Sequence, residues 1–167
     1  LAIFHQTTAP YTLMSNLKIS VYDGKANSFL SEISEGLTKA LEGFTPDQEA
    51  NSGYRWEPEG SDGWFKDFQL LDDEFRIIDS DEDWAVLEMS VSITVEAEGL
   101  FSLSVYDSID KDEVHMGSVT KLATEKFESE ILITVTGDLD GPIDKLEIEE
   151  VEIVNLIGSV NFGTIDL

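Results

Sequence analysis

Residues 84–107 read WAVLEMSVSITVEAEGLFSLSVYD, and apolar and polar side chains alternate along most of this stretch. Every odd-numbered residue from Ala85 to Ala97 is apolar, and the even-numbered residues from Glu88 to Glu98 are polar. A period of two over this length is typical of a β-strand with one face in a core, and a helix does not produce it. The alternation returns at residues 101–105, so we expect a second strand there, with Gly99 at the corner. Two such strands predict the start of an antiparallel sheet.

Other stretches with strand character follow the same logic. Their regular spacing, with no helix among them, predicts a mainly β fold and an antiparallel β-sandwich of about seven short strands. The phase of one strand slips between Glu149 and Glu150, as a β-bulge would make it, and Gly117 marks a bulge or a close backbone approach. The remaining expected strands are 75–78, 114–120, 127–136, 146–156 and 160–165.

The N-terminal quarter has a different pattern. Short strands are expected at residues 1–4 and 17–22. An amphipathic helix is expected over residues 28–41, and Gly43 is placed to end it. The apolar face of this helix consists of Leu30, Ile33, Leu37 and Leu41.

Composition shifts along the chain predict three segments. Residues 1–44 form a strand and helix segment, which resembles the end of an α/β domain. Residues 45–63 are rich in Pro, Gly, Asn and acids and are expected to be a linker. Residues 64–167 are expected to form the acidic β-sandwich domain.

The charge and the composition exclude several classes of protein. The chain holds 35 Asp and Glu against 10 Lys and Arg, a formal charge of −25. Such a field repels nucleic acids and anionic membranes, so we expect neither as a direct partner. There is no cysteine, which excludes disulfides and thiolate sites and fits a cytoplasmic protein. No apolar run is long enough for a transmembrane helix.

Acidic loops are the candidate metal sites. Hard cations such as calcium bind six to eight oxygen ligands, which clustered loop carboxylates can supply. The EF-hand pattern fails, because Ile143 stands where its invariant Gly is required. Solvated acidic turns are the alternative interpretation. The candidate ligands are Asp107, Asp110, Asp112, Asp138 and Asp140.

No catalytic residue can be selected from the sequence. His5 and His115 are far apart, and neither stands in a metalloprotease motif or beside a nucleophile elbow. We therefore expect no catalysis by this chain alone.

Four stretches of the sequence carry a family resemblance. Residues 101–120, 127–139 and 151–167 resemble the C-terminal β-rich region that accompanies some bacterial PIN-like nuclease domains. Residues 18–37 resemble the last strand and helix of such a domain. The matching positions are Asp107, Ser108, Asp110, Lys111, Gly117, Ser118, Asn161, Phe162 and Gly163.

The resemblance implies metal-dependent cleavage of RNA or DNA by a preceding domain, with Mg²⁺ or Mn²⁺ held by acids that lie outside this chain. We therefore expect this chain to be a non-catalytic accessory or regulatory domain whose partner is a basic protein surface or the nuclease domain itself. The alternatives are an acidic DNA mimic that inhibits a nucleic-acid-binding protein and a calcium-binding β-sandwich module.

Overall fold

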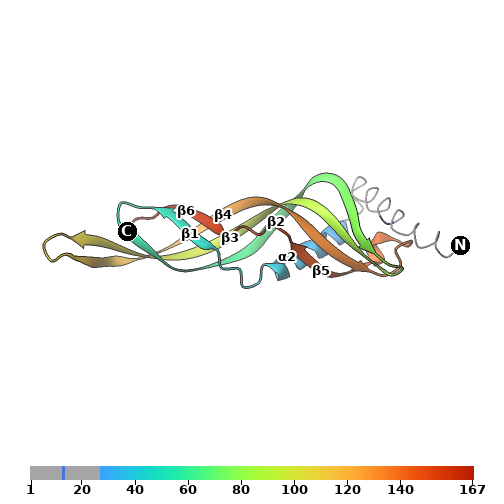
Figure 1. Cartoon of the computed structure of the whole chain (residues 1–167), viewed down its shortest axis with the longest axis horizontal. Coiled ribbons are helices and arrows are strands. Elements are labelled where there is room, and N and C mark those ends of the chain that lie inside the picture. The colour runs from blue at the N-terminus through green and yellow to red at the C-terminus, as the bar shows by residue number, and fades with distance from the viewer. Residues whose placement is uncertain (1–12, 14–26) are drawn as a thin grey trace. The chain divides into compact units, whose positions relative to one another are not determined.

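The computed structural model describes Leu13 and residues 27–167, and this part of the chain is mainly β (Figure 1). The expected strands at residues 1–4 and 17–22 lie outside the described residues, and so does His5. The elements are α2 (Asn27–Ala40), β1 (Asp47–Asn51), β2 (Arg55–Ser80), β3 (Trp84–Asp107), β4 (Asp112–Thr136), the 3-10 helix η1 (Ile143–Lys145), β5 (Glu147–Ile153) and β6 (Ser159–Thr164).

The strands of the described residues form two sheets. The larger has the order β2-β3-β4-β5, with β4 and β5 antiparallel, and the smaller pairs β1 with β6 in parallel. The expectation of a mainly β chain with an antiparallel sheet is confirmed. The parallel pair was not expected, because β1 lies in the predicted linker, whose polar sequence has no apolar alternation. Backbone pairing holds β1 instead: the Asp47 amide donates to the Gly158 carbonyl over 2.9 Å.

Three strands are much longer than predicted. Gly99 was expected to separate two strands. This prediction is wrong, because β3 passes through Gly99 without a break and is 24 residues long. The alternation keeps its phase across Gly99, and a Cβ there would lie 2.8 Å from Cζ of Phe162. This glycine therefore allows a close approach by Phe162, not a turn. In the same way, the short strands expected at 75–78, 114–120 and 127–136 are parts of β2 and β4.

At Gly117, where a bulge or a close backbone approach was predicted, φ is +148° and a Cβ would lie 3.0 Å from Cδ2 of Leu167, so a side chain comes close to the backbone there. The bulge predicted between Glu149 and Glu150 is confirmed. In the β4–β5 pair, Thr134 lies opposite Glu150 and Val135 lies opposite Ile148. Glu149 is thus the extra residue, at the point where the sequence phase slips.

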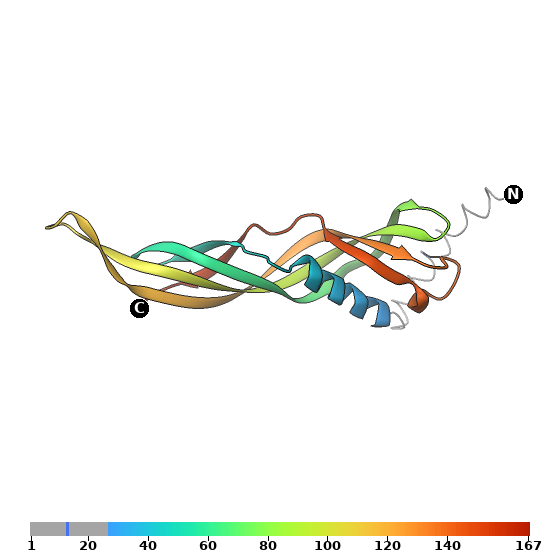
Figure 2. The same cartoon turned by 90° about the horizontal axis from the view of Figure 1, so that it is seen from below.

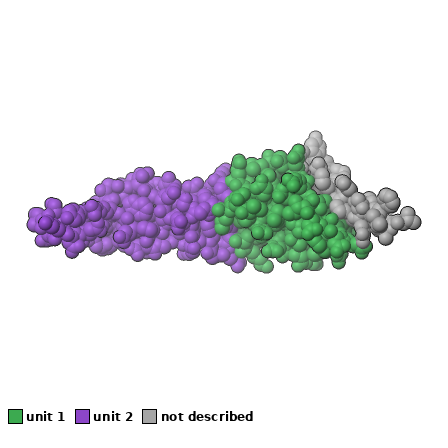
Figure 3. Space-filling view, in the orientation of Figure 1, with its two compact units in different colours: residues 1–40, 67–93, 128–156 green, residues 41–66, 94–127, 157–167 purple. Residues whose placement is uncertain are grey.

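The chain divides into two compact units, which are coloured separately in Figure 3. Unit 1 comprises residues 1–40, 67–93 and 128–156, and unit 2 comprises residues 41–66, 94–127 and 157–167. The long strands contribute residues to both units, so the units do not follow the expected segments 1–44, 45–63 and 64–167. Most of the expected linker is β1 and the start of β2, in unit 2.

In unit 1 a helix covers the sheet. Helix α2 lies along β5 (Figure 2), and a Cβ on Gly36 would lie only 2.3 Å from Cγ2 of Val151. Val151 pairs with Ile133, which is fully buried, so the helix lies on the core face of the sheet. Ile33 and Leu37 are buried as predicted, whereas Phe29 takes the deep position that was expected for Leu30.

In unit 2 aromatic side chains join the two sheets. The Phe101 ring meets the Trp56 ring edge-on at 5.5 Å and the Phe162 ring at 5.3 Å. The buried cluster comprises Ala97, Phe101, Leu103, Val160, Phe162 and Ile165.

Candidate interaction surface

The end of the β3–β4 hairpin, residues 105–116, lies in unit 2 and is exposed on both faces. Eleven of its twelve residues are exposed, and Asp107 is half-buried. In Figure 2 this yellow hairpin end extends beyond β1, β2 and β6 of the same unit. We call residues 105–116 the arm.

The arm carries large apolar side chains in water. Their exposed fractions range from 37% at Val105 to 89% at Ile109. Contiguous exposed apolar surface on a folded protein often marks an interaction site. The sequence analysis missed this surface, although residues 114–120 lack the alternation that marks a strand with one buried face. The exposed apolar residues of the arm are Val105, Tyr106, Ile109, Val114 and Met116.

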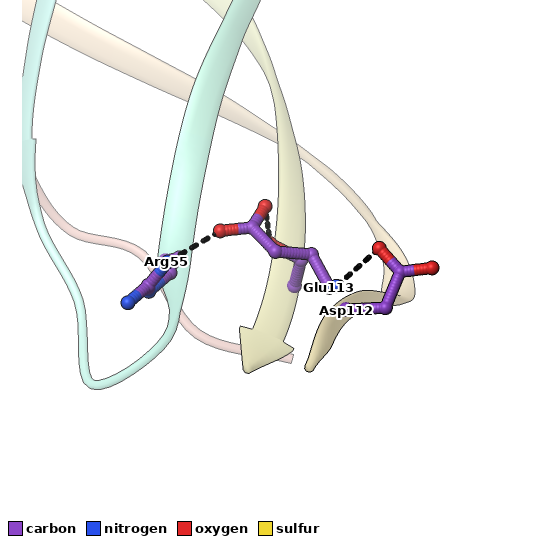
Figure 4. A network of polar contacts seen from close by, with 4 residues as sticks. Arg55, Asp112 and Glu113 are labelled. Carbon is purple, nitrogen blue, oxygen red and sulfur yellow. Dashed lines mark hydrogen bonds and ion pairs between the residues drawn. The ribbon is translucent and has the colours of Figure 1, made fainter. Parts of the chain in front are cut away.

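Polar contacts hold one face of the arm against β2. The Arg55 guanidinium donates to the Glu113 carboxylate over 2.6 Å (Figure 4) and lies over the Tyr106 ring, 5.1 Å from its centroid. The Ser104 hydroxyl also approaches Glu113, at 3.4 Å, and the Ser102 hydroxyl lies 3.2 Å from Nδ1 of His115. These contacts link side chains of β2, β3 and β4 on one face.

Three of the predicted calcium ligands lie at the turn of the arm, where the side chains of Asp107 and Asp112 accept backbone hydrogen bonds. Oδ1 of Asp107 accepts hydrogen bonds from the amides of Ile109, at 2.9 Å, and Asp110, at 3.4 Å. Oδ1 of Asp112 accepts from the Glu113 amide (Figure 4), and Lys111 has φ +55°. Asp side chains commonly form such turns. Ser108 and Asp110 are exposed in the same loop.

The other two predicted ligands lie in unit 1. Oδ1 of Asp138 accepts from the Asp140 amide over 3.0 Å, and the Asp138 carbonyl accepts from the Gly141 amide. The five candidate aspartates thus belong to two different units. Within residues 27–167, no three His, Asp or Glu side chains are grouped so that they could hold a metal ion.

The remaining positions of the family resemblance have conformational or packing roles. Oδ1 of Asn161 accepts from the amide of Gly163, which has φ +72°. Phe162 is part of the unit 2 core, Gly117 has φ +148°, and Ser118 is exposed. Because turn and bulge residues recur in unrelated folds, these contacts leave the family relationship a prediction.

An acidic groove lies between α2 and β5 in unit 1. Its floor includes Gly36, Ile148 and Val151. This groove adds local negative charge to a chain that already has a large excess of carboxylates. The charged residues that line it are Glu32, Glu35, Lys39, Glu147, Glu149 and Glu150.

The helices of the described part are too short or too polar to cross a bilayer. Comparison of the chain with protein-family models, with curated proteins and with solved structures finds no match.

Proposed function

We propose that this chain is a non-catalytic interaction module that binds a cationic surface of another protein. The supporting observation is the imbalance of charge: 35 carboxylates face 10 Lys and Arg, so at least 25 carboxylates have no cationic side chain of the same chain to neutralise them. A field of this sign favours association with basic surfaces and opposes association with phosphate backbones.

The proposed partner class is a PIN-like nuclease, which the resemblance of residues 101–120 and 151–167 suggests. The substrate groove of a nuclease must attract phosphates and is therefore basic. An acidic module that covers this groove would compete with the nucleic acid. The module would thus regulate cleavage without taking part in the chemistry.

The direct test uses a purified PIN-like nuclease domain and a single-stranded RNA substrate with Mn²⁺. The chain alone is expected to cleave nothing. Added to the nuclease, it is expected to raise the KM for RNA and leave kcat unchanged, with an effect that weakens as salt rises because the attraction is electrostatic. Polyglutamate of the same net charge serves as the control for charge alone.

Two results would contradict the proposal. One is cleavage by the purified chain that a single Asp→Asn substitution abolishes. The other is an effect on the nuclease no stronger than that of polyglutamate. Equal inhibition of unrelated DNA-binding proteins would instead favour the DNA-mimic alternative.

Calcium binding is the second candidate function, and the observation in its favour is the placement of Asp107, Asp110 and Asp112 on one short loop. Calorimetric titration with calcium is expected to release or absorb heat in the native chain and not in the Asp110→Asn, Asp112→Asn double variant. A native chain that gives no heat and no rise in melting temperature would exclude this function.

We also infer that the two sheets of unit 2 form a small β-sandwich. The inference is supported by its core cluster, which draws Phe101 and Leu103 from the larger sheet and Val160 and Phe162 from the smaller one.

A further inference from the structure

We propose that the arm, residues 105–116, is the contact element of the module, and that its apolar face docks on an apolar surface of a partner protein that is rimmed by Lys and Arg. This inference rests on the proposed interaction function and names the surface that carries it out.

Two contacts between β3 and β4 show which side chains share a face of the arm. Ser102 lies beside His115, and Ser104 lies beside Glu113. Side chains alternate along a strand, so the residues between these positions point to the other face. That face carries Leu103, Val105, Val114 and Met116, and we call the last three the apolar strip.

The apolar strip extends the row of buried side chains of β3 to positions that are exposed to solvent. Leu103 is fully buried, whereas Val105 is 37%, Val114 44% and Met116 45% exposed. Along β3 the row of inward side chains from Ala85 to Leu103 is buried without interruption. The side chains of the strip are therefore apolar like those of the core, but the rest of the chain buries them only in part.

The side chains on the opposite face of the arm make polar contacts within the chain. Arg55 binds the Glu113 carboxylate and stacks on Tyr106, so β2 braces this face. These contacts tie the arm to β2, and restraint of a binding element lowers the entropy cost of binding. The apolar strip is the face that these polar contacts leave uncovered.

The charge of the arm selects the kind of partner. The arm contains four carboxylates and one cationic side chain, Lys111. Its formal net charge is therefore 1 − 4 = −3 with His115 neutral. Two copies of the arm would repel each other, and an anionic membrane would repel it as well. An apolar surface with a cationic rim complements both the strip and its acidic border.

Two defined peptides of equal positive charge test the proposal on the full chain. One is an amphipathic helix of Leu and Lys, and the other replaces each Leu by Ser. The native chain is expected to bind the Leu/Lys peptide at least about tenfold more tightly, because only that peptide can cover the strip. The Val114→Ser, Met116→Ser double variant is expected to lose this preference and to bind the Ser/Lys peptide as the native chain does.

Leu122→Ser is the matched control, because Leu122 is 61% exposed on the same strand but lies outside the arm. This variant is expected to keep the preference. The melting temperature of each variant, which should equal that of the native chain, shows that the fold is intact.

The outcomes separate this inference from the proposed function. Equal binding of both peptides by the native chain, or a loss of preference in Leu122→Ser, would overturn the role of the strip and leave a charge-driven interaction module standing. Failure to bind either peptide at low salt would remove the proposed function too. Binding to vesicles of neutral phosphatidylcholine that the double variant loses would assign the strip to a membrane and overturn the protein partner.

Discussion

Unit 1 covers the core face of its sheet with helix α2, whereas unit 2 covers its core face with strand β6 and a group of aromatic rings. The same strand, β3, contributes to both cores and keeps one phase throughout. In unit 1 its inward residues are aliphatic or Ala, and in unit 2 they include Phe101, which contacts rings on other strands. One uninterrupted alternation can therefore serve two different covering layers.

In each unit the covering layer and the sheet make a close contact at a glycine. In unit 1 the glycine belongs to the cover, where Gly36 of α2 meets Val151. In unit 2 it belongs to the sheet, where Gly99 of β3 meets Phe162. A side chain at either position would push the two layers apart. Substitutions in the cores, at these contacts and on the surface test how far the two units are independent.

The largest expected effect is that of Phe101→Ala, which removes a fully buried ring and both of its aromatic contacts. The free energy of unfolding should fall by about 3–5 kcal/mol, since the cavity is large and the rings around it cannot fill it. Hydrogen exchange measured residue by residue should show the loss of protection in unit 2. Leu100→Ala, at an exposed neighbouring position, is the control and should cost less than about 0.5 kcal/mol.

Equal loss of amide protection in both units would show that they unfold together, because β2, β3 and β4 transmit the damage. That result would contradict the view that the two cores are stabilised independently by their own covering layers.

A smaller effect is expected for Gly36→Ala. The new Cβ would lie 2.3 Å from Cγ2 of Val151, and such overpacking typically costs about 1–3 kcal/mol. Alanine favours a helix over glycine by about 1 kcal/mol, so the net loss should be modest. In a Val151→Ala background the contact with Cγ2 is gone and only the Cβ of residue 151, at 2.9 Å, remains close, so the same substitution should cost less than in the native chain. Urea unfolding of the four variants measures this difference.

Gly53→Ala is the matched control, since no atom lies within 4 Å of a Cβ built at this position. A native-like stability of Gly36→Ala in the presence of Val151 would mean that α2 can shift on β5, and that the helical cover is looser than the aromatic one.

The smallest effect is expected at the surface ion pairs, and one pair from each unit is compared. Arg55 and Glu113 of unit 2 lie 2.6 Å apart, and Arg76 and Glu88 of unit 1 lie 3.5 Å apart. Exposed pairs contribute about 0.2–1 kcal/mol and are screened by salt. Double-mutant cycles at low and high salt should give the larger coupling for Arg55–Glu113, because its nitrogen and oxygen atoms lie closer together. A larger coupling for Arg76–Glu88 would contradict this order.

Part of the candidate surface was visible in the sequence. The aspartates at 107, 110 and 112 marked a loop, and Gly117 was expected to be a bulge. The apolar strip was not predicted, because the faces of β4 can be assigned only when the strand opposite is known. Once Ser102 and His115 are seen side by side, the assignment of Val114 and Met116 follows.

Local patterns determined the inward row from Ala85 to Ala97, the stripe of α2 that includes Ile33 and Leu37, and the bulge at Glu149, because side-chain direction depends on the backbone of a few neighbouring residues. Tertiary structure alone decided that Gly99 continues a strand, that β1 pairs in parallel with β6, and that one core is covered by a helix and the other by aromatic rings. Each of these outcomes depends on contacts between residues far apart in the chain, such as Gly99 with Phe162, and local alternation carries no information about which distant segment approaches.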